Sequence, residues 1–307
     1  MKNTFTFLII LLVCSCGDLE TVVELDVPDH EPVLVLNSNS NNQSEIKLFI
    51  SHSIDAFGDM VPSCISDANV LLFENEIFVD SLFPDFQDPS YFSFIKDRVE
   101  DSILVYYYKS DIIPSLNNSY NLEVNHPVYP SVSASTRVPI GVDINLLQTT
   151  DSEFIKFNFY DEPSQTNYYE LKVYVEGTKE YNGEIVTYRE RLEFGSNDLS
   201  FPGDIPFDGY TFYGRKVIFD DALFNGTQKQ ISIEIVDEEY IPNSTDSIYF
   251  EFTELSTEAY NYYSSRNSQI EDGAVGIFGG EVIPVYSNVE NGLGVFISFN
   301  TQNIYLD

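Results

Sequence analysis

Basic side chains are scarce in this sequence. Fifteen lysines and arginines stand against 49 aspartates and glutamates, so the formal net charge is −34 at pH 7. Binding to nucleic acid or to an anionic lipid surface requires basic patches. The charge therefore excludes nucleic acid as a partner. Because the acidic residues are scattered through loops rather than collected in one tail, they are best explained as a solubilising surface.

Motifs of enzyme active sites are missing as well. The three histidines, His30, His52 and His126, show no metal-ligand spacing, and there is no nucleophile-elbow or phosphate-loop motif. Adjacent acids such as Asp220 and Asp221 would point to opposite faces of a strand, which does not suit a pair of catalytic carboxylates. We expect a protein that is not an enzyme and has no catalytic residues. A glycan-binding adhesin or hydrolase that depends on calcium is the alternative.

The N-terminus has the composition of a secretory signal. Lys2 supplies a positive start, Phe5 to Val13 form an apolar run, and the small Ser15 precedes a cysteine. A run of this length is too short to cross a bilayer, which needs roughly 20 apolar residues. We predict that residues 1–15 are a signal peptide that is removed.

The end of this segment, Leu12-Val13-Cys14-Ser15-Cys16-Gly17, resembles the bacterial lipobox. Val13 fills the aliphatic position and Ser15 the small position if Cys16 is the lipidated residue. Cys14 fits less well, because Val13 would then precede the cut. Palmitate-type chains on Cys16 would anchor the protein, since each buried methylene contributes about 0.8 kcal/mol. A plain secretory signal with incidental cysteines is the alternative.

The remaining cysteine, Cys64, has no partner for a disulfide. Cys14 leaves with the signal and Cys16 carries lipid, so the fold is not held by disulfides even in a compartment that permits them. We predict that Cys64 is buried and inert. Residues 16–31 are acidic and too polar to form a core, and they are predicted to be a tether.

Phenylalanine and tyrosine are abundant, with 24 and 21 residues, which favours strands. Short alternating segments bounded by Asn, Asp, Pro and Gly are typical of antiparallel sandwiches. Examples are Tyr120 to Val124 and Phe154 to Phe159, whereas Asn37 to Asn42 reads as a turn. We predict an all-β fold with two β-sandwich domains, immunoglobulin-like or related, over residues 32–141 and 142–307.

One helix is predicted, from Ser256 to Asn267 in the second domain. Ser256 caps its first turn, Glu258 favours its N-terminal dipole, and Tyr260 and Tyr263 share a face. Tyr260, Tyr262 and Tyr263 are candidates for binding a partner, because tyrosine is enriched at interfaces. Packing of these rings onto the sandwich is the alternative.

Calcium is the one cofactor for which the sequence offers candidate ligands. Hard cations bind carboxylate and loop carbonyl oxygens, and Asp161, Glu162, Asp220 and Asp221 lie in predicted loops. No EF-hand spacing occurs in the chain. Solvated loop charge is the alternative.

Several motifs in order along the chain resemble domain-of-unknown-function family 4249, a group of Bacteroidota outer-membrane lipoproteins. They are Asp67 to Val70, Tyr120 to Val124 with Tyr129 to Ala134, Tyr168 to Leu171, Phe219 to Asp221 with Phe224 to Gly226, and Pro284 to Phe296. The segment from Asp272 to Gly280 departs from the family pattern, which tends to have an Asn-Pro-Phe-like turn there.

The resemblance implies a location and a type of partner. Family members are often encoded beside TonB-dependent receptors of the SusC type, so a role next to such a barrel is implied, in substrate capture or as structural cover. Asp18 and Glu20 resemble the acidic export signal of surface lipoproteins, which favours the cell surface over the periplasmic leaflet. A subunit of an outer-membrane assembly or secretion machine is an alternative.

Overall fold

The computed structural model describes residues 30–55, 61, 63–96, 98–150, 154–181, 183–203, 209–237, 240, 246–273 and 284–306. Their contacts group residues 32–307 into one compact unit, apart from residues 1–31. Within the described ranges the chain is almost entirely β-strand, with one helix, α2 (Thr257–Gly273). The predicted all-β fold is therefore confirmed.

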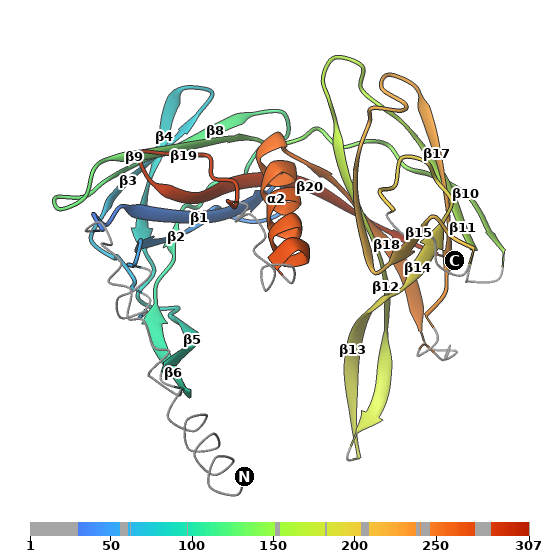
Figure 1. The fold of residues 1–307 in the computed structure, drawn as a ribbon, viewed down its shortest axis with the longest axis horizontal. Coiled ribbons are helices and arrows are strands. Elements are labelled where there is room, and N and C mark those ends of the chain that lie inside the picture. The colour runs from blue at the N-terminus through green and yellow to red at the C-terminus, as the bar shows by residue number, and fades with distance from the viewer. Residues whose placement is uncertain are drawn as a thin grey trace, which may run out of the picture. The chain divides into compact units, whose positions relative to one another are not determined.

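One large sheet runs through both halves of the described chain (Figure 1). Thirteen described strands belong to it. In spatial order they are β13 (Glu184–Leu192), β12 (Tyr168–Tyr181), β18 (Ser247–Leu255), β20 (Leu293–Tyr305), β1 (Leu34–Asn41), β2 (Lys47–His52), β7 (Tyr108–Lys109), β4 (Ile77–Pro84), β3 (Asn69–Glu74), β8 (Ser119–Asn125), β9 (Val132–Arg137) and β19 (Val289–Glu290), with β16 (Lys216–Asp220) paired to β12.

Two smaller sheets complete the described strands. One has the order β10 (Asn145–Thr150), β11 (Phe154–Tyr160), β17 (Gln228–Ile235), β14 (Phe194–Ser196) and β15 (Phe212–Gly214). The other is a hairpin of β5 (Ser90–Lys96) and β6 (Val99–Val105), which projects from the body in Figure 1.

The first hydrophobic core lies inside the N-terminal part of the large sheet. It is filled by every second side chain of the strands. In β8, for example, Tyr120, Leu122 and Val124 all point inward. The sheet curls until β9 lies against β20, where the Ser298 hydroxyl donates to the Arg137 carbonyl at 2.7 Å. Phe296 of β20 is buried in this core, so the last strand of the chain completes the first half.

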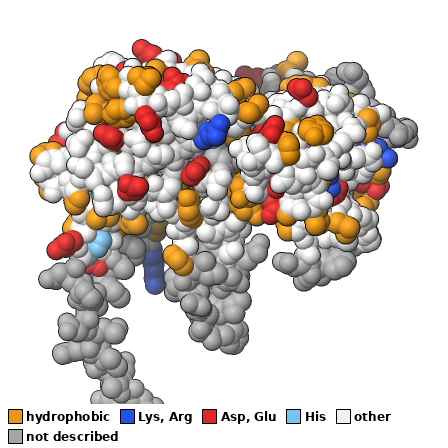
Figure 2. Space-filling model, turned by 90° about the horizontal axis from the view of Figure 1, so that it is seen from above, with side chains coloured by type: hydrophobic (Ala, Val, Ile, Leu, Met, Phe, Trp, Pro, Cys, Tyr) orange, Lys and Arg blue, Asp and Glu red, His pale blue; other side chains and the backbone are white. Residues whose placement is uncertain are grey.

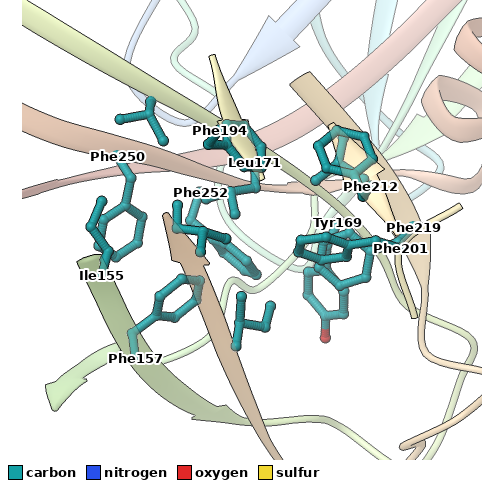
Figure 3. Close-up of a cluster of buried hydrophobic side chains, with 14 of the residues drawn as sticks. Ile155, Phe157, Tyr169, Leu171, Phe194, Phe201, Phe212, Phe219, Phe250 and Phe252 are labelled. Atoms are coloured by element: carbon teal, nitrogen blue, oxygen red, sulfur yellow. The ribbon is translucent and has the colours of Figure 1, made fainter. Parts of the chain in front are cut away.

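The second core lies between the large sheet and the five-stranded sheet, as a sandwich requires. Aromatic rings dominate it (Figure 3). Phe157 of β11 stacks on Phe250 of β18 with ring centroids 4.6 Å apart, and Phe159 packs on Phe252 at 5.1 Å. The alternating strands that the sequence predicts for the second half therefore face each other across one aromatic layer.

The predicted turn from Asn37 to Asn42 is wrong, because residues 37–41 continue β1. They pair in parallel with β20, in a register that places Asn37 opposite Val295. The Ser38 hydroxyl donates to the Lys47 carbonyl at 2.7 Å, and Ser38 and Ser40 are buried. Pairing with β20 along this whole stretch, and with β2 at Asn37, satisfies the backbone and outweighs the turn propensity of asparagine and serine.

The predicted boundary between residues 141 and 142 lies where one core gives way to the other. Val138 belongs to the first core and Val142 to the second. Strand β20, however, contributes Phe296 to the first core and packs Ile304 against the second. Residues 32–307 form one compact unit by their contacts. The division into two domains stays a prediction.

Helix α2 begins where the sequence predicts. The Ser256 hydroxyl accepts a hydrogen bond from the Ala259 N–H at 3.2 Å and so caps the first turn. The helix continues beyond Asn267 to Gly273. Ala259 is fully buried against Val295 and Ile297, which occupy the face of β20 opposite to Phe296.

Gly294 makes the parallel pairing of β1 and β20 possible. Its φ is +102°, and a Cβ atom there would lie 1.9 Å from the Leu36 carbonyl oxygen. We expect Gly294→Ala to lower the free energy of unfolding by about 3 kcal/mol or more in urea titration. Gly183→Ala is the control, because φ is +82° there but no atom lies within 4 Å; it should cost only about 1–2 kcal/mol. Equal losses would contradict this account.

Candidate functional site

The predicted lipidation site, Cys16, lies outside the described residues. Within them, no helix is long and apolar enough to span a membrane. Cys64 is a free cysteine, and its Sγ accepts a hydrogen bond from the Tyr106 N–H at 3.3 Å. It is half-buried rather than buried as predicted, because it lies outside the strands and does not occupy the core face of one.

Two of the four calcium candidates are buried and hold the fold together. Asp161 accepts hydrogen bonds from the Tyr169 hydroxyl at 2.5 Å and from the Gly226 N–H at 2.9 Å. Asp221 accepts from the Asn167 N–H at 2.9 Å. Both carboxylates are thus engaged by internal donors that tie the start of β12 to the turn after β16.

Of the other two candidates, Glu162 lies in the loop after β11, whereas Asp220 is the last residue of β16 rather than a loop residue as predicted. Glu162 is exposed and accepts from the Ser164 N–H at 3.2 Å, and Asp220 accepts from the Ala222 N–H at 3.1 Å. Among the residues that the structure describes, no group of three or more His, Cys, Asp or Glu has the arrangement of a metal site. Calcium binding by these residues stays a prediction.

A third buried acid, Glu254, was not singled out in the sequence. Its carboxylate accepts from the Asn167 side-chain amide at 2.8 Å and from the Gly141 N–H at 2.7 Å. Burial raises the pKa of Glu254 above its ordinary value, and these two hydrogen bonds oppose the shift. Burial likewise raises the pKa of Asp221. The signal that could have found Glu254 is its spacing, because residues two apart on a strand share a face and Glu254 follows the buried Phe250 and Phe252 at that interval.

Asn167 and Glu254 open onto a cleft of about 980 Å³. We call it the amide cleft, because amide side chains recur around it: Asn42, Asn145, Gln165, Gln228, Asn300 and Gln302. The described residues that line it include no lysine, arginine or histidine. Tyr160 stands at its wall with a largely exposed ring. The cleft is therefore polar, weakly acidic and large enough for a small ligand.

The three helix tyrosines have different surroundings. Tyr260 stacks on Tyr168 with centroids 4.1 Å apart, so it packs the helix onto the sheet. Tyr262 and Tyr263 instead line a second cleft of about 920 Å³, together with Phe49 and Phe92. Burial raises the pKa of Tyr263. All three tyrosines are half-buried, and partner binding by them stays a prediction.

The β5–β6 hairpin carries apolar side chains that no described core covers. Exposed fractions are 75% for Tyr91, 77% for Ile95 and 65% for Val99, and Phe92 and Leu104 are also exposed. A lone two-stranded hairpin is only marginally stable in water, and clustered exposed apolar residues mark interaction surfaces. The hairpin was not predicted as a separate element, because the residue pattern of its strands does not differ from that of strands in a sandwich.

The surface away from this hairpin is mixed. On the face seen in Figure 2, acidic side chains are scattered among neutral and apolar ones, and basic side chains are few. This distribution agrees with a solubilising role for most of the negative charge.

The fold and these surfaces define an all-β protein with a polar cleft and an exposed apolar hairpin. The family model for the domain of unknown function DUF4249 matches residues 20–304. The chain belongs to this family. A comparison with curated proteins finds no match.

The raised pKa of Glu254 gives a pH dependence with a definite sign. A carboxyl whose pKa is higher in the folded state than in the unfolded state stabilises the fold as the pH falls between these two values. The free energy of unfolding of the wild type should therefore rise relative to Glu254→Gln when urea titrations move from about pH 7 to about pH 5. Glu184→Gln, at an exposed hairpin tip, is the control. The same pH dependence in both variants would contradict the role of burial.

Proposed function

We propose that this protein is a lipid-anchored, non-enzymatic accessory subunit of an outer-membrane barrel complex in Bacteroidota. The partner is a TonB-dependent, SusC-like transporter, which the subunit serves in substrate capture or as structural cover. The observation that carries the proposal is the apolar β5–β6 hairpin, because its side chains would lose their contact with water in a complex.

The anchor supports the choice of a membrane partner. A lipid on Cys16, followed by the acidic tether that contains Asp18 and Glu20, would hold the described domain close to the membrane at the cell surface. Two proteins confined to one membrane meet at a high effective concentration, so even a modest apolar contact suffices to join them. An exposed hairpin of two strands is an adequate contact under these conditions.

The hairpin also suits a protein partner rather than a nucleic acid. Its exposed residues include Tyr91 and Phe92, and aromatic side chains are enriched at the centres of protein interfaces. The overall net charge of −34 opposes binding to phosphate backbones.

Lipidation is tested by metabolic labelling with palmitate. We expect Cys16→Ser to abolish the label and to release the protein from the membrane fraction, because the thiol is the acyl acceptor. Cys14→Ser is the matched control and should keep both the label and the membrane location. Loss of the label in Cys14→Ser but not in Cys16→Ser would show that Cys14, and not Cys16, is the lipidated residue.

The partner is tested by purifying the full-length protein from its own membrane in mild detergent and identifying co-purifying barrels by mass spectrometry. We expect a TonB-dependent transporter, and we expect Ile95→Asp to reduce its recovery at least about tenfold, since a charge would be buried in the contact. Val128→Asp is the control, because Val128 is 75% exposed outside the hairpin. An assembly or secretion barrel would assign the protein to that machine instead. Recovery of no barrel would contradict the proposal.

A further inference from the structure

We infer that the amide cleft binds a neutral saccharide through its hydroxyl groups. The inference names a ligand class for substrate capture, but it rests on the cleft alone and would stand if no barrel partner were found. Four observations carry it: the fixed amides of the wall, its buried carbonyl oxygens, its lack of basic groups, and the exposed ring of Tyr160.

Strand β20 holds two amides of the wall in fixed orientations. The Asn300 side chain donates to the Ile140 carbonyl at 2.8 Å, and the Gln302 side chain donates to the Val142 carbonyl at 2.7 Å. Residues two apart on a strand share a face, so both amides project from the same side of β20. Each bond uses one N–H of the amide, so each side chain keeps its carbonyl oxygen as an acceptor and a second N–H as a donor for a ligand.

A second observation points to a missing donor. Asn167 is 3% exposed, and its side-chain oxygen has no hydrogen-bond partner among the described residues, although its amide nitrogen donates to Glu254. The side-chain oxygen of Asn42 at the same wall is also buried without a described partner. Buried carbonyls normally have a donor. The hydroxyls of a saccharide both donate and accept, so they match a wall that combines amides with such acceptors.

The charge of the cleft decides between ligand classes. Asp143, Glu162 and Glu254 line it, and no described lining residue is basic. Phosphates, sulfates and uronates would therefore meet carboxylates without any balancing cation. The oxygens of Glu254 already accept from Asn167 and Gly141, which leaves the inner wall to neutral hydrogen-bonding groups.

Tyr160 and Gln228 form the outer wall together. They are opposite each other in the pairing of β11 with β17, so the ring and the amide lie side by side. Tyr160 is 62% exposed. Its ring offers an apolar face for the C–H side of a sugar, and the neighbouring amide reaches the hydroxyls. Leu116 and Ile140 add further exposed apolar surface at the cleft.

The test uses the full-length protein in a detergent that contains no sugar. The probes are neutral oligosaccharides of glucose, mannose and xylose, with an oligomer of glucuronate as the anionic comparison. Saturation-transfer NMR and titration calorimetry measure binding. We expect saturable binding of at least one neutral oligosaccharide and weaker binding of the glucuronate oligomer.

Variants locate the binding. Tyr160→Ala and Gln228→Ala should each weaken affinity about tenfold or more while the melting temperature stays close to that of the wild type. Gln230→Ala is the control for the amide, since Gln230 is exposed on the same face of β17 but does not line the cleft. Tyr181→Ala is the control for the ring, because Tyr181 is 64% exposed in another hairpin. Both controls should bind as the wild type does.

Three results would overturn the inference: no binding of any neutral probe, tighter binding of the glucuronate oligomer, or equal weakening by the control variants. Because the assay needs no barrel, failure here leaves the accessory role intact. Failure of the co-purification would likewise leave saccharide binding intact.

Discussion

The parallel pairing of β1 with β20 is the constraint on which the rest of the structure depends. It joins the first described strand to the last across almost the whole length of the chain. Successive residues of β20 then pack against different parts of the protein: Phe296 lies in the first core, while Val295 and Ile297 pack against helix α2. Such a pairing requires a close approach of two backbones, and Gly294 permits it because any Cβ would collide with Leu36.

The same arrangement explains where the polar cleft lies. As the chain passes from the first core to the second, the segment that contains Gly141 is held by Glu254 of β18 and by Asn300 of β20. Side chains that form hydrogen bonds with the backbone of this segment must be polar, and here they are amides and one buried carboxylate. The stretch of chain that connects the two cores thus has a polar wall, and that wall is available to a ligand.

Much of the fold was predictable because burial in a sandwich imposes alternation. Strands β8 and β11 and the Ser256 cap of α2 follow from local pattern alone. The extension of β1 from Asn37 to Asn41 did not, because its partner beyond Asn37 is the distant β20. Local propensity carries no information about such partners.

The candidate site was less predictable than the fold. Asp161 and Asp221 looked like loop acids, yet they are buried and engaged by Tyr169, Gly226 and Asn167. Glu254, Asn300 and Gln302 converge only after β18 and β20 pair, so no spacing in the sequence brings them together. Of the tyrosines singled out in α2, Tyr260 packs on Tyr168, while Tyr262 and Tyr263 line the second cleft.

The claim that the β5–β6 hairpin docks on a barrel is tested most directly by photo-crosslinking in living cells. A photoreactive amino acid placed at Ile95 should give one crosslinked product that contains an outer-membrane barrel protein. The same group at the equally exposed Val128 should give none. Crosslinks to a barrel at neither position, or equally at both, would contradict the account.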